Sequence, residues 1–569
     1  MRLRRSVPSL AIVLIGGAVW NVGSWVAHAD PTWSRGEEIP PQGRNNPLEL
    51  NSDKLKILSK KGREHALNYP VAMTGEVLPR DLALRFFSRE NGLNPLLNFM
   101  QGIFKRIVHL QKFSDVERMV GLVDYPEDEG TGAYYVPMPE GKKPWYKMGT
   151  SFINAPEGPA ITFSCATCHA GELFGKKVIG LTNRFPRANE FFLNGRAATS
   201  FVPTPIFKST LKATEEEARM YERLRDNAQF IDGRMPLVRG LDTSLAHVAL
   251  SLTRRAEDES ASKNDDNRIH PRDSILRHQP GDSKPAVWWN VKYKNKFLLD
   301  GSVVAGNPIF TNLLWNEIGR GSDLTELSRW LDDNSQVVQE LTAAVFSAEA
   351  PQFLDFFPVE HFDLSTVKKG QQLFQQNCAM CHGNYIKGYQ RSNSNGLSNR
   401  ELLATVKVEY HRNTPVVNVG TDPLRAQGMS ALAEPLNRLA ISKKNGIVVE
   451  VQRGYVPPPL VGIWARWPYL HNNSVPSLCS LLTPALERPV QWDVGEAHST
   501  QTDFDSQCNG YPLGEKAPQA WKKNRWGHFD TRRRGMSNVG HDEGIFSENG
   551  RSKFSSEDRQ ALIQFLQTL

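Results

Sequence analysis

The chain has 569 residues, of which 40% are hydrophobic and 23% charged, and its formal charge is +7 at pH 7. This is the balance of an ordinary globular protein, and the length suggests about three domains with sizeable cores. No dense lysine and arginine stripe with interleaved aromatic residues is present, so nucleic acid is not an expected partner.

The first 29 residues have the pattern of a signal peptide. Three arginines lie within the first five residues, an apolar run follows from Ser9 to Val22, and Ala27-His28-Ala29 supplies a cleavage site. The alternative, an uncleaved membrane anchor, is less favoured because the apolar run is short for a span. We therefore expect residues 1–29 to be removed, a mature start near Asp30, a charge of +4, and a periplasmic or secreted protein. No second apolar run reaches spanning length, so we expect no membrane span in the mature chain.

Residues 30–145 carry no recognisable motif, and prolines and glycines interrupt them towards the end. We interpret this region as an N-terminal extension that packs on the domain that follows it. A polar stretch from Glu257 to Lys284 is expected to form a surface loop. The aromatic-rich connector from Ala348 to Pro358 indicates a boundary, which divides the remainder into domains at 146–350 and 351–569.

Four of the six cysteines lie in two copies of one pattern, Cys165-Ala-Thr-Cys168-His169 and Cys378-Ala-Met-Cys381-His382. Two thiols at this spacing bond to the two vinyl groups of haem, and the adjacent histidine binds the iron. A thioredoxin-like redox pair or a zinc knuckle does not require histidine directly after the second cysteine. The sequence therefore predicts two covalently bound haem c groups, with His169 and His382 as iron ligands.

Two amphipathic helices flank the second motif. One runs from Asp363 to Phe374, with Ser365 as its predicted N-cap. The other follows Ser555, which makes a capping pattern with Asp558, and its apolar residues recur at helical spacing up to Leu569. This placement is typical of a class I cytochrome c domain, in which the glycine and the phenylalanine of the first helix, here Gly370 and Phe374, let it cross the last helix closely. The predicted fold is mainly α, with two cytochrome-c-like haem domains, long loops and the N-terminal extension.

The remaining cysteines, Cys479 and Cys508, are expected to form a disulfide because the predicted compartment is oxidising. Two buried free thiols are the alternative.

Three stretches resemble segments of bacterial di-haem cytochrome c peroxidases and their relatives, and they are most similar to the larger rubber-oxygenase-like branch. They are Pro458 to Leu478, which contains Pro468-Tyr469-Leu470-His471, then Val287 to Tyr293, and Gly535 to His541. The resemblance covers roughly residues 150–569. Without its first 29 residues, the chain is longer than ordinary di-haem peroxidases and shorter than the rubber oxygenases.

The resemblance implies two facing cytochrome-c-like domains whose haems exchange electrons. One haem has six ligands, and the other has an open or weakly held distal position where peroxide or dioxygen reacts. In the relatives that cleave polyisoprene, dioxygen binds at the N-terminal haem and two histidines hold the C-terminal one. Carried over by motif, His541 is the first candidate for the sixth ligand of the haem on His382.

Other residues compete for that position. Met536 and Met429 are alternative thioether ligands, whereas Met380 lies within the motif and cannot reach the far face. His471 is expected either to line a haem pocket or the region between the haems, or to have a structural role.

No distal ligand is assigned to the haem on His169. The histidines that follow this motif are His247, His270 and His278. Trp288 and Trp289 are candidates for an electron bridge or for pocket walls, and ordinary core aromatics are the alternative. Phe297 or Phe310 is a candidate lid over the iron.

Three functions follow from these expectations. The first is a peroxidase that receives electrons from a small cytochrome or cupredoxin. The second is a dioxygenase that cleaves a hydrophobic polyene, and the third is an electron carrier without bond chemistry. The protein would set ligation and access in each case, while haem supplies the difficult chemistry.

Overall fold

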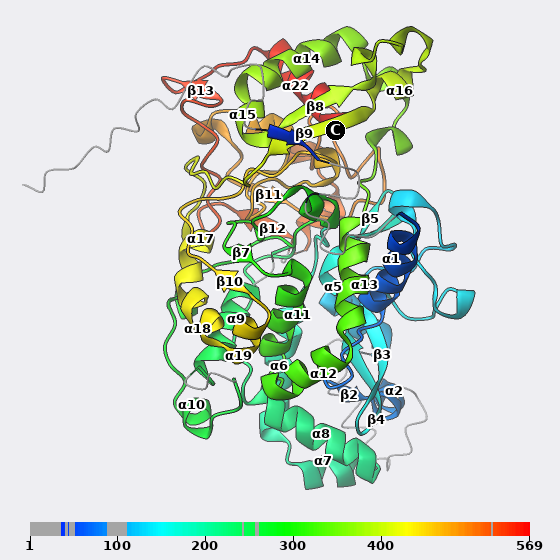
Figure 1. Cartoon of the computed structure of the whole chain (residues 1–569), viewed down its shortest axis with the longest axis vertical. Coiled ribbons are helices and arrows are strands. Elements are labelled where there is room, and N and C mark those ends of the chain that lie inside the picture. The colour runs from blue at the N-terminus through cyan, green and yellow to red at the C-terminus, as the bar shows by residue number, and fades with distance from the viewer. Residues whose placement is uncertain are drawn as a thin grey trace, which may run out of the picture.

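The computed structural model describes residues 36–39, 44, 52–87, 111–241, 244–256, 261–524 and 527–569. The predicted signal segment, residues 1–29, and the predicted start at Asp30 lie outside these ranges. Helices dominate the elongated molecule, and the strands form small sheets (Figure 1). The mainly α expectation is confirmed.

The second motif lies at one end of the molecule, beneath a crossing of two helices (Figure 1). These are α14 (Leu364–Asn377) and α22 (Ser556–Gln567). They cross at Gly370, where an added Cβ would lie 2.0 Å from the Ala561 carbonyl oxygen. Beside the crossing, the rings of Phe374 and Phe565 lie 5.2 Å apart. The predicted close packing of the two helices is therefore confirmed.

The caps of these helices differ in how well the sequence predicted them. Ser555 caps α22 and forms a reciprocal capping box with Asp558, as its pattern indicated. The prediction of Ser365 as the N-cap of α14 is wrong, because Asp363 accepts the hydrogen bond from the Thr366 amide. An aspartate can hold this position as well as a serine, and Ser365 lies in the first turn.

Helices also form the opposite end of the molecule and its middle (Figure 1). Before α14 the longer ones are α1 (Ser52–Leu67), α2 (Arg80–Phe87), α4 (Phe113–Val120), α6 (Ala188–Phe201), α7 (Thr204–Leu211), α8 (Glu215–Ala228), α9 (Ser244–Thr253), α11 (Pro308–Gly319), α12 (Leu324–Asp333) and α13 (Ser335–Phe346). The predicted polar loop from Glu257 to Lys284 contains two short helices, α10 (Asp265–Ile269) and a 3₁₀ turn at Ile275–Arg277.

Each pairing between the strands of the described ranges is antiparallel. One three-stranded sheet has the order β1 (Gly36–Glu38), β9 (Thr405–His411), β8 (Asn384–Lys387), and the other has the order β2 (Leu78–Pro79), β4 (Gly158–Phe163), β3 (Thr150–Ala155). The two-stranded sheets pair β5 (Ala170–Leu173) with β6 (Lys176–Ile179), β7 (Val303–Ala305) with β10 (Val448–Val449), β11 (Gln491–Asp493) with β12 (His528–Asp530), and β13 (Ser547–Glu548) with β14 (Arg551–Ser552).

Segments from the N-terminal and C-terminal parts of the chain are interleaved in space. Helix α1, from the predicted extension, packs against α13 in the first half, while strand β1 pairs with β9 beside the second motif. Conversely, α17 (Leu424–Gly428), α18 (Ala433–Arg438) and α19 (Ala440–Lys444) lie next to the middle of the molecule, where β10 joins β7 (Figure 1). The boundary near residue 350 stays a prediction, and segments on either side of it share contacts.

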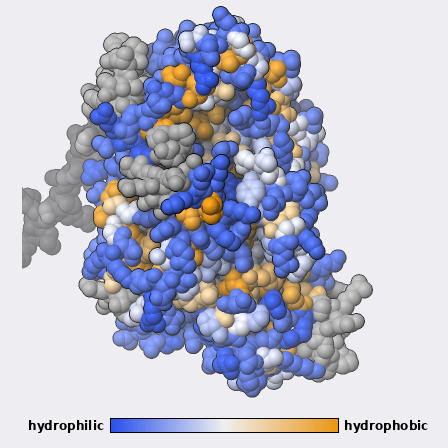
Figure 2. Space-filling view, turned by 45° about the vertical axis from the view of Figure 1, so that its right-hand side comes forward, coloured by the Kyte–Doolittle hydropathy of each residue, from blue (hydrophilic) through white to orange (hydrophobic). Residues whose placement is uncertain are grey.

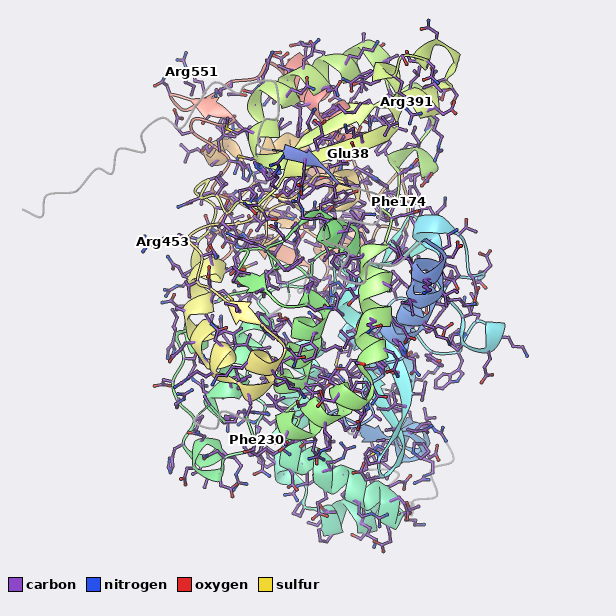
Figure 3. The ribbon with its side chains drawn as sticks, in the orientation of Figure 1. Glu38, Phe174, Phe230, Arg391, Arg453 and Arg551 are labelled. Atoms are coloured by element: carbon purple, nitrogen blue, oxygen red, sulfur yellow. A yellow bond between two sulfur atoms is a disulfide. The ribbon has the colours of Figure 1, made fainter. Side chains whose placement is uncertain are left out.

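An aromatic cluster joins the region of the first motif to the region of the second. Phe174, labelled in Figure 3, follows β5 and packs its ring against four others. These are the rings of Phe356, Phe357, Trp467 and Phe504, at centroid distances of 5.4 to 6.1 Å. One hydrophobic core, which extends from Ile39 to Leu569, runs through both regions.

The face in Figure 2 is hydrophilic over most of its area, and its hydrophobic side chains gather in small separate patches. Within the described ranges, we find no helix that combines the length and the apolar character needed to cross a bilayer.

We expect Gly370→Ala to lower the free energy of unfolding by about 1–3 kcal/mol, because the new methyl group would overlap the backbone of α22. Urea denaturation followed by circular dichroism measures this change. Gln372→Ala, at an exposed position of the same helix, is the matched control and should leave stability nearly unchanged. Equal midpoints for the two variants would contradict the close crossing.

Candidate haem centres

The first motif forms the short helix α5 (Ala166–His169), which leads directly into β5. The Nδ1 atom of His169 lies 3.0 Å from the carbonyl oxygen of Ala286. Because a carbonyl only accepts, Nδ1 must carry the proton and donate it. This leaves the Nε2 atom unprotonated, as binding to iron requires.

The second motif repeats this arrangement. Helix α15 (Ala379–His382) follows α14 directly, and Nδ1 of His382 donates to the carbonyl oxygen of Pro458 at 2.8 Å. The hydroxyl of Tyr385 donates to the His382 carbonyl at 2.8 Å. The ring and the backbone of this histidine are therefore both fixed, with Nε2 available to a metal.

A cavity of about 250 Å³ lies beside the second motif. Cys378, Cys381 and His382 line it, together with Leu562 and Leu566 from the last helix. Its walls are mainly apolar, which suits the faces of a porphyrin ring. Both thiols and the proximal imidazole that a covalently attached haem needs therefore border one cavity.

His541 faces His382 across this cavity. The centres of the two imidazole rings lie 6.2 Å apart, and the ring planes are inclined by 22°. An imidazole nitrogen binds a transition metal at about 2 Å and lies roughly 1.1 Å from its own ring centre, so two histidines on one metal have centres about 6 Å apart. The observed separation therefore matches one iron between the two rings.

The loop that carries His541 is held by its backbone. Gly540 and His541 both have positive φ angles, 98° and 52°. Glycine is needed at 540 because a Cβ there would lie 2.6 Å from the Thr421 amide nitrogen. The His541 amide donates to the Val419 carbonyl at 3.0 Å, and the Arg488 guanidinium donates to the carbonyls of Gly540 and His541 at 2.8 and 3.2 Å.

Burial sets the protonation of these groups. It lowers the pKa of His169 and of His382 to about 4, and that of His541 to about 3. The three imidazoles are thus neutral at pH 7, the form that binds a metal. Burial also raises the pKa of Cys165 to about 11 and that of Cys378 to about 12, so both are thiols before haem attachment.

Three cationic side chains, those of Lys284, Lys294 and Arg466, line the cavity at the second motif. Among the described residues that line it, there is no aspartate or glutamate. Burial, reinforced by the neighbouring Arg466, lowers the pKa of Lys294 to about 8 and that of Lys284 well below its usual value. An anionic ligand would relieve this excess of positive charge, and haem carries two carboxylates. The residues present therefore fit a bound haem.

The alternative candidates for the sixth ligand do not lie where His541 lies. Met429 and Met536 are buried in the core and are not among the residues that line the cavity, while Met380 is exposed. His471 does line it, with its ring stacked on Tyr455 at 4.2 Å and its Nε2 atom 3.2 Å from the Tyr455 hydroxyl oxygen. This position agrees with the pocket-lining alternative for His471.

The surroundings of the first motif are different. The ring of Trp288 lies 6.0 Å from that of His169, on the side of the segment that supports it. In the described part of the chain, no second histidine ring stands opposite His169 in the way that His541 stands opposite His382. Trp289 is fully buried, and its Nε1 atom donates to the Val461 carbonyl at 3.0 Å.

Other side chains proposed near the first iron have ordinary packing. His247 is buried, and its Nε2 atom donates to the carbonyl oxygen of Gly319. The backbones of Gly319 and Gly233 lie close to its ring. His270 and His278 are exposed. Phe310 is buried in α11, and the backbone of Phe297 pairs with Val303. A role for either phenylalanine as a lid stays a prediction.

The predicted disulfide is confirmed, since Cys479 and Cys508 are bonded. It joins the start of α20 (Leu478–Leu481) to the segment that precedes Tyr511. This region supplies Leu478, Leu481 and Leu482 to the cavity wall. The bond therefore braces this part of the cavity wall.

The sequence analysis missed the three cations and the two supporting carbonyls. Nothing in the local pattern marks Lys284 or Lys294, and Arg466 reaches the same cavity from a distant part of the chain. Arg466 lies within the resembling stretch, which is the one signal that pointed to it. Carbonyl supports have no sequence signal beyond the prolines at 457–459.

Comparisons with known proteins agree with this class of site. The family described as "Cytochrome c" matches residues 367–434, which include the second motif. The family described as "RoxA-like, cytochrome c-like" matches residues 454–493, which include Pro458, Arg466 and His471. These matches support a cytochrome c or RoxA-like superfamily, and they imply covalently bound haem c and a haem redox protein.

Two curated proteins of Sinorhizobium fredii (strain NBRC 101917 / NGR234) are also similar. "Uncharacterized protein y4iJ" is 26% identical over 257 residues, which cover 36% of this chain and 39% of that protein. "Uncharacterized protein y4iM" is 26% identical over 202 residues, which cover 34% of this chain and 45% of that protein. The chain spans less than half the length of these two relatives.

We expect His541→Ala to change the second haem from low-spin to high-spin, because the variant removes the imidazole opposite His382. Absorption and electron paramagnetic resonance spectra of the purified protein measure the spin state. His471→Ala, which removes a second histidine from the same cavity, is the matched control and should leave the haem low-spin. An unchanged His541→Ala spectrum would remove His541 as a ligand.

We expect Arg466→Gln to lower the reduction potential of the second haem by tens of millivolts. A buried cation stabilises the reduced form, which carries one positive charge fewer, and about 59 mV corresponds to a factor of ten for one electron. Spectroelectrochemical titration measures the potential. Arg391→Gln, at the exposed arginine labelled in Figure 3, should leave it unchanged, whereas equal shifts in both variants would argue against a local effect.

Proposed function

We propose that the chain is a di-haem c-type oxidoreductase with one closed and one open iron site. One observation carries this proposal: His541 faces His382, whereas among the described residues no histidine ring faces His169 in the same way. His382 and His541 would occupy both axial positions of one iron, which suits electron storage. His169 would leave one axial position of the other iron accessible to an oxidant.

The chain's own residues would set ligation and charge. Haem supplies one-electron and oxygen chemistry when it is bound. The carbonyls of Ala286 and Pro458 orient the two proximal imidazoles, and Lys284, Lys294 and Arg466 would hold the haem carboxylates of the second site. The apolar walls would exclude water from the second site.

Peroxide reduction is the reaction that uses both sites. Hydrogen peroxide, two protons and two electrons give two water molecules, and the electrons would come from a small cytochrome or cupredoxin. A closed site that stores one electron beside an open site suits this two-electron reaction. The asymmetry also disfavours a simple carrier, in which both irons would have strong ligands on both faces.

A second candidate is a dioxygenase that converts a carbon–carbon double bond and dioxygen into two carbonyl groups, with a hydrophobic polyene as substrate. The match of residues 454–493 to the RoxA-like family favours it, and so does the pair His382 and His541, as the resemblance implied two histidine ligands in that branch. This reaction needs no external electrons in each turnover.

The proposal also includes the organisation and location of the protein. Residues 146–350 and 351–569 would each hold one haem c, with residues 30–145 as the extension. Residues 1–29 would direct export, since haem c is attached outside the bacterial cytoplasm. The protein would then be periplasmic or secreted.

We expect the haem-loaded protein to oxidise a reduced small cytochrome rapidly when hydrogen peroxide is added, and stopped-flow absorbance at the donor's α band measures this. Oxygen uptake with a polyisoprene emulsion and no reductant is measured in parallel. Uptake with carbonyl products would favour the dioxygenase instead. No donor oxidation and no oxygen uptake would contradict both enzymatic proposals and leave the electron carrier.

A further inference from the structure

The segment from Ala286 to Asn290 lies between the two haem motifs. At one end, the Ala286 carbonyl accepts the hydrogen bond from Nδ1 of His169 at 3.0 Å. At the other end, Nδ2 of Asn290 donates to the carbonyl of Pro459 at 3.0 Å. Both Ala286 and Asn290 also line the cavity at the second motif. Five consecutive residues therefore connect the support of the first proximal histidine with the wall of the second site.

The connection continues to the second proximal histidine. Pro459 is bonded to Pro458, whose carbonyl accepts from Nδ1 of His382 at 2.8 Å. One unbroken path of covalent and hydrogen bonds thus runs from the His169 ring through Ala286–Asn290 and Pro459–Pro458 to the His382 ring. Its three hydrogen bonds are 2.8 to 3.0 Å long, which is ordinary geometry for N–H···O contacts.

Asn290 is the side chain that makes the path continuous. It is 3% exposed, and its Nδ2 atom supplies the polar link between the two backbone segments. Pro457, Pro458 and Pro459 have no amide protons with which to anchor themselves, so side chains hold this stretch. Tyr410 donates to the Pro457 carbonyl at 2.6 Å, and Arg466 reaches the Pro459 carbonyl at 3.4 Å. The Asn290 bond is the shorter of the two on Pro459.

We propose that Asn290 is a positioning residue that couples the two proximal histidines and completes a through-bond route for electron exchange between the sites. The inference rests on the proposed function, which requires the two irons to exchange electrons. One electron would leave the reduced second site and arrive at the oxidised first site. No bond forms or breaks, and no proton moves along the route. The indole rings of Trp288 and Trp289 offer a competing route through side chains.

The test uses the full-length, haem-loaded protein and the variant Asn290→Leu, which keeps the branched shape of the side chain but removes the donor. A short pulse of radiolytically generated electrons reduces part of the protein, and the redistribution between the two haems is followed by their separate absorption bands. Asn295→Leu is the matched control, because Asn295 also donates to a backbone carbonyl, that of Arg412 at 2.8 Å, but lies off the route.

We expect exchange in Asn290→Leu to be slower by about ten-fold or more, the range typical of changes behind a metal's own ligands. Asn295→Leu should match the wild type. The electron paramagnetic resonance signal of the second iron should also shift in Asn290→Leu, because Pro459, the neighbour of the Pro458 whose carbonyl supports His382, loses this hydrogen bond. Both reduction potentials are measured, so that a rate change at equal driving force can be assigned to the coupling.

The possible results separate the inference from the proposed function. Wild-type protein without exchange between the haems would overturn both. Exchange that stays at the wild-type rate in Asn290→Leu, with both haems bound, would overturn the inference alone and favour the tryptophan route. If Asn290→Leu does not bind two haems, Asn290→Ala replaces it, because alanine removes the donor without adding bulk. The same slower exchange is expected, and a wild-type rate would overturn the inference.

Discussion

Each proximal histidine depends on one hydrogen bond, from its Nδ1 atom to a backbone carbonyl. Without that acceptor, the imidazole has no fixed tautomer and no fixed rotation about its side chain. The acceptor must be a carbonyl that no helix or sheet uses, so it has to come from irregular chain. Ala286 and Pro458 meet this requirement just before a 3₁₀ turn and within a run of three prolines. The long connections of this protein are therefore part of its candidate haem sites.

The local features of the second site were predictable because they are encoded over short distances. The motif cysteines, the glycine and phenylalanine of α14, and the capping pair of α22 each lie within a few turns of the group they serve. His541 was identified through a resembling segment, and the structure places it opposite His382. The N-cap at Ser365 failed because Asp363, two residues earlier, competes for the same role.

Features in which residues far apart in the chain come together in the fold were not predictable. Lys284 and Lys294 meet Arg466 at one cavity from a distant part of the chain, and of the three only Arg466 lies within a resembling stretch. The pairing of β1 with β9 and the return of α17 to α19 towards the middle of the molecule also join residues far apart in the chain. Hydrophobic periodicity describes which face of an element is buried, but it does not name the partner that buries it.

Helix α22 closes the cavity at the second motif, and this has a consequence for haem attachment. Leu562 and Leu566 of α22 line the cavity, so this wall is missing until α22 has packed across α14. Before then Cys378 and Cys381 border an open groove, and afterwards the helix crossing restricts access to them. Attachment of a porphyrin at this motif would therefore be easiest before α22 packs across α14. A chain that closes empty would require reopening of the α14–α22 crossing before it is loaded.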